Sequence, residues 1–341
     1  MLMGINKKKA IALYSGGLDS ILAIKLILEQ GIEVTGVYFK TPFLKDQPDC
    51  WGEKYLNIPL IYEDLGKDFK EILFNPKYGF GKNKNPCIDC RILMFKKAGV
   101  LMIREGASFI ISGEVLGQRP MSQSKKNLLL ISEESGYGKY ILRPLSALLL
   151  PETEPEKRHT VNRAGLLDIQ GRSRKKQMVL ARQWGIEYYP SPAGGCKLTE
   201  PGFARRIKDL LSKRKYNTND LELLKSGRHF NIHKNVKLVV GRDEKENKIL
   251  LSFARQEDYL FSSPTHKGPV ALLRFYNNMT VKNDKEVEEI LDLAGRITAR
   301  YCDKEENLDL IDINIWQNNK IIRKVDRVSS LPEQLIKNYL I

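Results

Sequence analysis

The stretch Ser15-Gly16-Gly17-Leu18-Asp19-Ser20 lies directly after an apolar run, residues 10–13, and directly before an apolar helical pattern, residues 21–28. This order predicts a strand, a glycine-rich turn and the start of a helix. The two glycines let the backbone turn tightly, and the unpaired N–H groups at the helix start lie at the positive end of its dipole. An anion binds favourably there, so the stretch predicts a phosphate-binding loop. The alternative is an ordinary capped turn.

Residues 10–200 alternate short apolar runs with helical patterns. Strands are expected at residues 10–14, 33–39, 58–62, 109–112 and 141–145, and helices at residues 20–29, 91–104 and 172–184. Alternation of this kind predicts an α/β fold with a parallel sheet and helices on both faces. Ligands of such sheets bind at the carboxyl ends of the strands, which is where the phosphate loop follows the first strand.

The pattern changes after Cys196. Helices are expected at residues 204–214 and 285–300, and strands at residues 236–240, 249–253, 270–275, 308–316 and 321–325. A chain of 341 residues has room for about two domains. We therefore expect one domain over residues 1–200 and a smaller α+β domain over residues 201–341.

The chain has a formal net charge of +15, from 56 lysine and arginine residues against 41 aspartate and glutamate residues. This surplus favours a polyanionic partner such as nucleic acid, although a solvated basic surface would give the same composition. No apolar run approaches the length of a membrane span, and the N-terminal apolar run reads as a first strand rather than a signal peptide. The sequence thus favours a cytoplasmic protein whose cysteines serve catalysis or metal binding rather than disulfides.

Three cysteines form a second group of interest: Cys87 and Cys90 in Asn85-Pro86-Cys87-Ile88-Asp89-Cys90, and Cys196 far downstream. Neighbouring proline and glycine residues place them on turns, and a helix that begins near Cys90 is expected to lower the pKa of its thiol. Three interpretations remain open. The thiols hold a [4Fe–4S] cluster whose fourth iron binds sulfide, or Cys87 or Cys90 carries a persulfide that Cys196 attacks, or the three hold a structural zinc. Cys50 and Cys302 have no motif partner and are expected to be ordinary apolar cysteines.

A third polar segment, residues 112–123, follows the apolar run 109–111. Gly113 and Gly117 permit close backbone approach. Uncharged hydrogen-bonding groups suited to a base edge or a ribose are supplied by Gln118, Ser122 and Gln123, whereas Arg119 suits a phosphate. The alternative is a plain polar loop.

Basic residues also gather at 171–176, where a helix is expected to begin. A solvated helix face and a phosphate contact both explain such a run. Arg143 ends an expected strand on the ligand edge of the sheet and serves either as a phosphate contact or as the partner of a carboxylate.

The phosphate loop matches neither the lysine-containing nucleotide loop nor the Gly-x-Gly-x-x-Gly loop, and Ser-Gly-Gly-x-Asp-Ser instead resembles the loop of the PP-loop ATPases. With Gly113-Glu114-x-Leu116-Gly117-Gln118 after a strand, it resembles the PP-loop domain of the tRNA 4-thiouridine synthases, the ThiI family. Asn85-Pro86-Cys87-x-x-Cys90 resembles the cysteine motif of the tRNA 2-thiouridylases (MnmA). The three-cysteine set is similar to that of the iron–sulfur tRNA thiolases TtcA and TtuA. The resemblance covers residues 8–210.

The resemblance implies an enzyme that cuts ATP between its α- and β-phosphates, adenylates a carbonyl oxygen of a tRNA base and replaces that oxygen with sulfur. It implies that ATP, with Mg²⁺, is bound by the following residues: Ser15, Gly16, Gly17, Asp19, Ser20, Gly113 and Gln118. It also implies a [4Fe–4S] cluster on Cys87, Cys90 and Cys196, which with Asp19 are then the catalytic residues. 4-Thiouridine is the favoured product. The alternatives are 2-thiouridine or 2-thiocytidine, an amidotransferase-type PP-loop enzyme, and a non-enzymatic RNA-binding module.

The implied partners are tRNA and a sulfur donor, either sulfide or a persulfide-carrying protein, and a homodimer is left open. The 4-thiouridine synthases carry an N-terminal THUMP RNA-binding domain and some carry a C-terminal rhodanese domain, neither of which is expected in this sequence. We therefore expect the C-terminal module to contact tRNA. The candidate phosphate contacts are basic residues in and after the helix expected at 204–214: Arg205, Arg206, Lys208, Lys213, Arg214 and Lys215.

Overall fold

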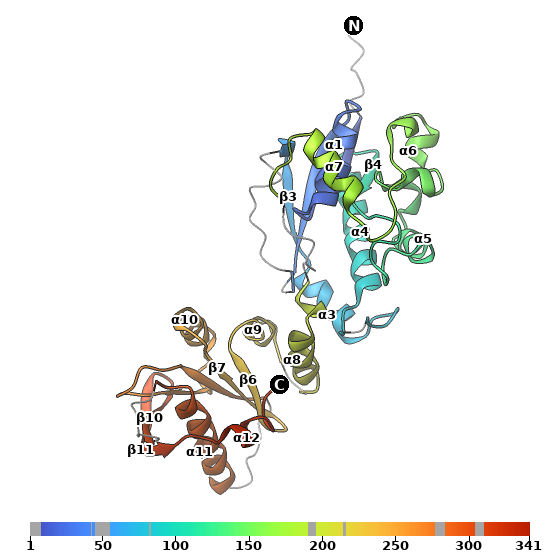
Figure 1. Cartoon of the computed structure of the whole chain (residues 1–341). Helices are drawn as coiled ribbons and strands as arrows, with labels where there is room; N and C mark the ends of the chain where they lie inside the picture. The colour runs from blue at the N-terminus through green and yellow to red at the C-terminus, as the bar shows by residue number, and fades with distance from the viewer. Residues whose placement is uncertain are drawn as a thin grey trace. The chain divides into compact units, whose positions relative to one another are not determined.

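The computed structural model describes residues 8–41, 43–44, 55–81, 83–189, 196–213, 216–276, 284–303 and 310–341. The chain divides into two compact units, Met1–Thr199 and Glu200–Ile341 (Figure 1). None of the helices in the described part of the chain is long and apolar enough to cross a membrane.

The N-terminal unit is built on a five-stranded sheet in the order β3-β2-β1-β4-β5. Its strands are β1 Lys9–Leu13, β2 Glu33–Lys40, β3 Leu60–Asp64, β4 Phe109–Ser112 and β5 Ile141–Leu142. Every pairing in this sheet is parallel, which confirms the predicted fold class. Strand order runs outward from β1 in both directions, so the carboxyl end of β1 lies at the topological switch point where ligands of such sheets bind.

Helices cover both faces of this sheet. The helices of the unit are α1 Leu18–Leu28, α3 Gly66–Phe74, α4 Cys87–Arg104, α5 Lys125–Glu134, α6 Glu154–Lys157 and α7 Lys175–Gln183. Short 3₁₀ turns lie at Gly138–Tyr140, Ala147–Leu149, Arg163–Gly165 and Lys197–Thr199. Ala10 and Ala12 pack in one apolar cluster with residues of α1 and α7, whereas the equally buried Ile11 is not in that cluster. Because alternate residues of a strand face opposite sides, Ile11 faces the side on which α4 contacts β1.

The C-terminal unit contains a six-stranded antiparallel sheet in the order β11-β10-β8-β9-β7-β6. Its strands are β6 Arg228–His233, β7 Val236–Val240, β8 Tyr259–Ser262, β9 Ala271–Phe275, β10 Leu310–Gln317 and β11 Lys320–Ser329. Its helices are α8 Pro201–Leu211, α9 Thr218–Leu223, α10 Glu244–Phe253, α11 Asp284–Arg300 and α12 Glu333–Ile336. The long helix α11 packs Ala294 and Ile297 against Phe230 and Ile313 of the sheet, so this unit is the expected α+β module with its own core.

The strand predicted at residues 249–253 is wrong. These residues form the second half of α10, which begins after Asp243, whose side chain accepts a hydrogen bond from the Glu246 N–H at 2.8 Å. Leu250 is fully buried while Leu251 is half-exposed, as expected for one turn of a surface helix. Strands β6 and β8 were not predicted, because β6 carries polar residues at several positions and β8 is only four residues long.

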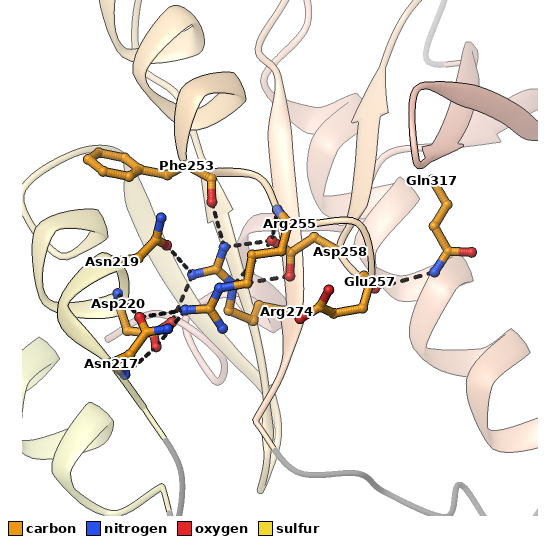
Figure 2. Close-up of polar contacts among 9 residues, drawn as sticks. All are labelled: Asn217, Asn219, Asp220, Phe253, Arg255, Glu257, Asp258, Arg274 and Gln317. Atoms are coloured by element: carbon orange, nitrogen blue, oxygen red, sulfur yellow. Dashed lines mark hydrogen bonds and ion pairs between the residues drawn. The ribbon is translucent and has the colours of Figure 1, made fainter.

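A buried network of charges fixes α9 and the chain between α10 and β8 onto the C-terminal sheet (Figure 2). Arg274 of β9 donates hydrogen bonds to Asp258 at 2.6 Å and to Asp220 at 2.7 Å. Arg255 also pairs with Asp220 at 2.8 Å, and Arg274 donates to the Phe253 carbonyl at 2.8 Å. The guanidinium of Arg274 therefore forms hydrogen bonds with two buried carboxylates and with the carbonyl of the last residue of α10. These bonds remove the free-energy cost of burying those groups without partners.

Asp209 of α8 sits between two buried lysines. Its carboxylate lies 3.2 Å from the Nζ of Lys213 and 3.0 Å from the Nζ of Lys237, and both lysine side chains are 1% exposed. Lys213 also donates to Asn231 and to the Lys234 carbonyl. The expectation that Lys213 contacts RNA phosphate is therefore wrong, because its ammonium group is buried and paired with Asp209, and this ion pair helps to join α8 to the sheet. Arg214 and Lys215 lie outside the described residues.

Replacing Asp209 with Asn is expected to lower the free energy of unfolding of the C-terminal unit by about 3 kcal/mol, since it leaves two buried ammonium groups without a counter-charge. Differential scanning calorimetry of the full chain measures this change. Glu244→Gln is the matched control, because Glu244 pairs with Lys248 on an exposed surface and should leave the melting temperature unchanged. Equal melting temperatures for both variants would contradict this account of Asp209.

Candidate active site

The predicted phosphate loop joins β1 to α1 at the switch point of the sheet. Gly16 has a φ of +70°, a backbone conformation that residues other than glycine rarely adopt, and Gly17 is the N-cap of α1. The Ser20 hydroxyl donates to the Gly17 carbonyl at 2.7 Å, and the Ser15 hydroxyl donates to Ser20 Oγ at 3.2 Å. The two serines thus close the loop on itself beside the start of α1, where the Gly17 N–H also donates to Ser15 Oγ and the Ser20 N–H donates to the Gly17 carbonyl.

The two carboxylate oxygens of Asp19 differ in their hydrogen bonding. Its Oδ2 accepts a hydrogen bond from Gln118 Nε2 at 3.0 Å, whereas its Oδ1 is buried and has no partner among the described residues. A Cβ on Gly113 would lie 2.7 Å from the backbone of Asp19, so only glycine allows this approach. The segment singled out after β4 therefore lies directly against the loop after β1. A buried acceptor without a donor is costly unless a ligand or cation supplies the partner.

Cys87 and Cys90 occupy the first turn of α4, which begins at Cys87 with Pro86 as its N-cap. Asn85 Nδ2 donates to Cys87 Sγ at 3.0 Å. As whole residues, Cys87, Cys90 and Cys196 are each partly exposed.

Backbone contacts with the segment after β2 fix the position of Cys196. It forms a β-bridge with Leu44, just after β2, and the adjoining Lys197 N–H donates to the Phe43 carbonyl at 2.8 Å. Asn83 Nδ2 donates to the Thr199 carbonyl at 2.6 Å and so ties the loop before α4 to the end of the unit. The three cysteines interact electrostatically with one another, which places their thiols in one region.

The expectation that the helix start lowers the pKa of Cys90 is wrong. Burial raises the pKa of the Cys90 thiol to about 12, and the nearby Cys196 and Cys87 raise it further, while Arg91 opposes the shift. Burial likewise raises the pKa of Cys196 to about 11. Desolvation of the thiolate is the largest cause of the shift and sets its direction at this position.

Within the described part of the chain, no three Cys, His, Asp or Glu side chains are arranged to hold a metal ion. The zinc interpretation therefore finds no support there. A four-iron cluster is larger than one ion and keeps its cysteine sulfurs farther apart, and three thiols in one region are the kind of soft donor that such a cluster requires. Cys302 is buried in the C-terminal unit, as expected of an ordinary cysteine, and Cys50 lies outside the described residues.

Sequence reasoning missed a buried ion pair beside the cysteines. Arg143 Nε donates to Glu114 Oε2 at 3.0 Å, and both side chains are almost fully buried. Arg143 is thus the partner of a carboxylate, one of the two alternatives considered for it. Glu114 Oε1 lies 3.6 Å from Nε of Arg91, the residue after Cys90, so this carboxylate connects the segment after β4 to the cysteine helix. The available signal was a glutamate two residues after the end of a fully buried strand.

The start of the basic run at residues 171–176 contacts the segment after β4. The Gly171 N–H donates to the Leu116 carbonyl at 2.7 Å, and Gln170 forms a β-bridge with Leu116. The charge of Lys176 is offset by Asp168 at 2.9 Å. Ser122 and Gln123 are buried, and their suitability for a base edge or a ribose stays a prediction.

Two family models match the chain, one in each unit. Residues 5–153 match the family described as Thiamine biosynthesis protein (ThiI), which confirms the resemblance drawn from the motifs. Residues 227–340 match the family described as NFACT protein RNA binding domain. The sequence predicted an RNA contact in this module but not this family. The motifs of the first unit are short and local, whereas the second unit carries no such motif.

The chain is 32% identical over 153 residues to a "Probable tRNA sulfurtransferase" of Thermococcus kodakarensis, covering 41% of this chain and 37% of that protein. It is 33% identical over 119 residues to a "tRNA-specific 2-thiouridylase MnmA" of Sulfurimonas denitrificans, covering 32% of this chain and 35% of that protein. The chain thus spans about a third of the length of these curated relatives. A solved structure described as "Crystal structure of a 4-thiouridine synthetase - RNA complex with bound ATP" is 19% identical, with a TM-score of 0.35, and covers 64% of this chain and 52% of that chain.

Proposed function

We propose that this protein is an ATP-dependent tRNA sulfurtransferase that adenylates a base carbonyl oxygen and replaces it with sulfur, with 4-thiouridine as the favoured product. One observation carries the proposal. A nucleotide-type loop and three gathered thiols lie in one unit, and the segment after β4 touches Asp19 through Gln118 and the cysteine helix through Glu114. The match of residues 5–153 to the ThiI family and the names of the relatives support it.

The first half of the reaction uses the loop after β1. The backbone N–H groups of the loop and of the first turn of α1 would bind the phosphates of ATP. The free Oδ1 of Asp19 would hold Mg²⁺, which supplies positive charge to the phosphates when bound. The base oxygen attacks the α-phosphorus, the bond from that phosphorus to the bridging oxygen breaks, and pyrophosphate leaves. The chain mainly positions the two reactants and excludes water, which protects the adenylated base from hydrolysis.

The second half of the reaction uses the cysteines. Cys87, Cys90 and Cys196 would hold a [4Fe–4S] cluster, which supplies a binding site for sulfide when present. Sulfide attacks the activated ring carbon, a carbon–sulfur bond forms, and the carbon–oxygen bond breaks as AMP leaves with the electron pair. AMP is a good leaving group, whereas an unactivated carbonyl oxygen is not.

The experiment that tests the function measures AMP and pyrophosphate release from ATP in the presence of tRNA, with mass spectrometry of the tRNA nucleosides. We expect both products to appear only with tRNA, and we expect 4-thiouridine to be missing from tRNA of a strain that lacks the chain. AMP release with a free base or amide substrate and not with tRNA would instead favour the amidotransferase-type alternative. RNA binding without AMP release would favour a binding module.

The C-terminal unit supplies the proposed RNA contact. It matches the NFACT RNA-binding model over residues 227–340, and the chain as a whole carries a net charge of +15. Arg205 and Lys208 are exposed and share a face of α8, because they are three residues apart. Arg206 is a weaker candidate than we expected, because its Nη1 donates to the Leu224 carbonyl at 3.0 Å.

Replacing both Arg205 and Lys208 with Gln is expected to weaken tRNA binding and to reduce the slope of log Kd against log salt by about two, because each lost phosphate contact lowers counterion release. Binding is measured by filter retention over a series of salt concentrations, and ATP affinity should be unchanged. The matched control is Arg104→Gln with Lys157→Gln, which removes the same charge from exposed positions of the N-terminal unit. Wild-type affinity and slope in the first variant would place the RNA contacts elsewhere.

A further inference from the structure

A short closed loop, residues 117–123, lies between the two halves of the proposed site. Gly117, with a φ of +74°, donates its N–H to the Gln123 carbonyl at 2.7 Å. The Gln123 N–H in turn donates to the Arg119 carbonyl at 2.9 Å. Asn127 at the start of α5 donates its side-chain amide to the Met121 carbonyl. These bonds fix the backbone of the loop and therefore the positions from which its side chains extend.

The loop touches the nucleotide side at one position and the cysteine side at another. Gln118 Nε2 donates to Asp19 Oδ2 at 3.0 Å. Met121 Sδ lies 3.9 Å from Asn85 Nδ2, which also donates to Cys87 Sγ at 3.0 Å. Arg119 stands between Gln118 and Met121 in the chain, and its guanidinium interacts electrostatically with Asp19, Cys87 and Cys196. It is therefore placed where the nucleotide loop and the thiols meet.

Arg119 carries a charge that the protein does not neutralise by contact. Its guanidinium forms no hydrogen bond or ion pair with any residue in the described ranges, and Arg119 is exposed. The buried guanidinium of Arg143, by contrast, is bonded to Glu114. Protein atoms around the guanidinium and the nearby charge of Arg91 both lower the pKa of Arg119, although an arginine stays charged at neutral pH. Two nearby cations repel each other, and an anion beside them offsets that repulsion.

We propose that Arg119 is a catalytic residue that binds the phosphate of AMP during sulfur transfer. The inference rests on the proposed function, because the anion is the phosphate that links AMP to the activated base. As sulfide forms the carbon–sulfur bond and the carbon–oxygen bond breaks, the electron pair stays on the departing phosphate oxygen. The guanidinium stabilises that oxygen with a pair of charge-assisted hydrogen bonds, for which its planar fork is suited. The position of Arg119 beside both Asp19 and the thiols meets this requirement.

The test is an anaerobic single-turnover assay with tRNA, ATP and sulfide, which follows pyrophosphate release, AMP release and 4-thiouridine separately. Arg119→Gln is expected to slow AMP release and 4-thiouridine formation by about 10²-fold, in the range seen when one stabilising donor is removed. ATP affinity and the melting temperature should stay at wild-type values. Arg119→Lys keeps the charge without the fork and should give an intermediate rate. Arg104→Gln, at the far end of α4 from Cys87, is the control and should be fully active.

Three results would count against this role. Wild-type rates of AMP release in Arg119→Gln would overturn it directly. A loss of ATP affinity or melting temperature in Arg119→Gln that accounts for the lost rate would show a structural role and overturn it too. If the wild-type protein itself releases no AMP with tRNA, the proposed function fails rather than the assignment of this one residue.

Discussion

Replacing Asp19 with Ala or Asn is expected to reduce AMP formation by about 10³-fold while the protein stays folded. Either change removes the negative charge from the one carboxylate oxygen that is buried at the nucleotide loop without a partner. Without that charge the loop loses its ligand for Mg²⁺, and the phosphates lose the positive charge that the ion supplies. Asn retains an acceptor for Gln118 Nε2, so it preserves the contact between the loop and the segment after β4. The measurement is AMP release from labelled ATP in the presence of tRNA.

The control for this experiment is Asp68→Asn. Asp68 lies on α3 and pairs with Lys97 on an exposed surface, so its replacement should change neither activity nor melting temperature. Circular dichroism melting of the Asp19 variants should match that of the wild type. If Asp19→Asn forms AMP at the normal rate, the loop does not work as an ATP site and the assignment is wrong.

Replacing Cys87, Cys90 or Cys196 with Ser is expected to abolish 4-thiouridine formation and to leave ATP binding intact. Wild-type protein purified without oxygen should be brown and contain about four irons and four sulfides per chain, because three thiolates suffice to hold a [4Fe–4S] cluster by three of its irons. Each of the three serine variants should lose that colour, since a hydroxyl is a poor ligand for this group. Iron and sulfide analysis beside nucleoside mass spectrometry measures both effects.

Cys302→Ser is the matched control for the cysteine series. Cys302 is buried in the C-terminal unit, where its thiol donates to the Thr298 carbonyl at 3.7 Å, so its loss should affect neither iron content nor product. A colourless anaerobic wild-type protein with full activity would overturn the cluster and favour a persulfide on Cys87 or Cys90. Full activity of all three serine variants would exclude both kinds of sulfur chemistry.

The parallel sheet of the N-terminal unit was predictable because its strands are short, mostly apolar and separated by helical patterns. The run at residues 10–13 needed no tertiary information, and β1 lies within one residue of its predicted bounds. The run at residues 249–253 looked equally apolar, yet it is a helix, because the cap at Asp243 and the neighbouring strands decide its structure. Local pattern alone does not separate a short buried strand from one helical turn.

The sequence indicates which residues belong to the candidate site, but it does not indicate which of them contact one another. Gly113 and Gln118 could be singled out by their place after a strand, but their contact with Asp19 depends on how the chain crosses the sheet. The helix start beside Cys90 was visible, whereas the desolvation that raises its pKa depends on atoms from distant segments. Lys213 likewise looked like a surface cation, and only the position of Asp209 shows that it is buried.

The bridge between Cys196 and Leu44 has a consequence for the newly made protein. Cys196 follows Cys90 by about 100 residues, so a ribosome that adds about 5–20 residues per second delivers the third thiol several seconds after the first two. During that interval Cys87 and Cys90 stand in the nascent chain without Cys196, and the bonds of Phe43 to Lys197 and of Asn83 to Thr199 do not yet exist. Sulfur or iron delivered by the cell before this moment would meet only two ligands. The three cysteines of the proposed site can therefore come together only after the ribosome has passed Thr199.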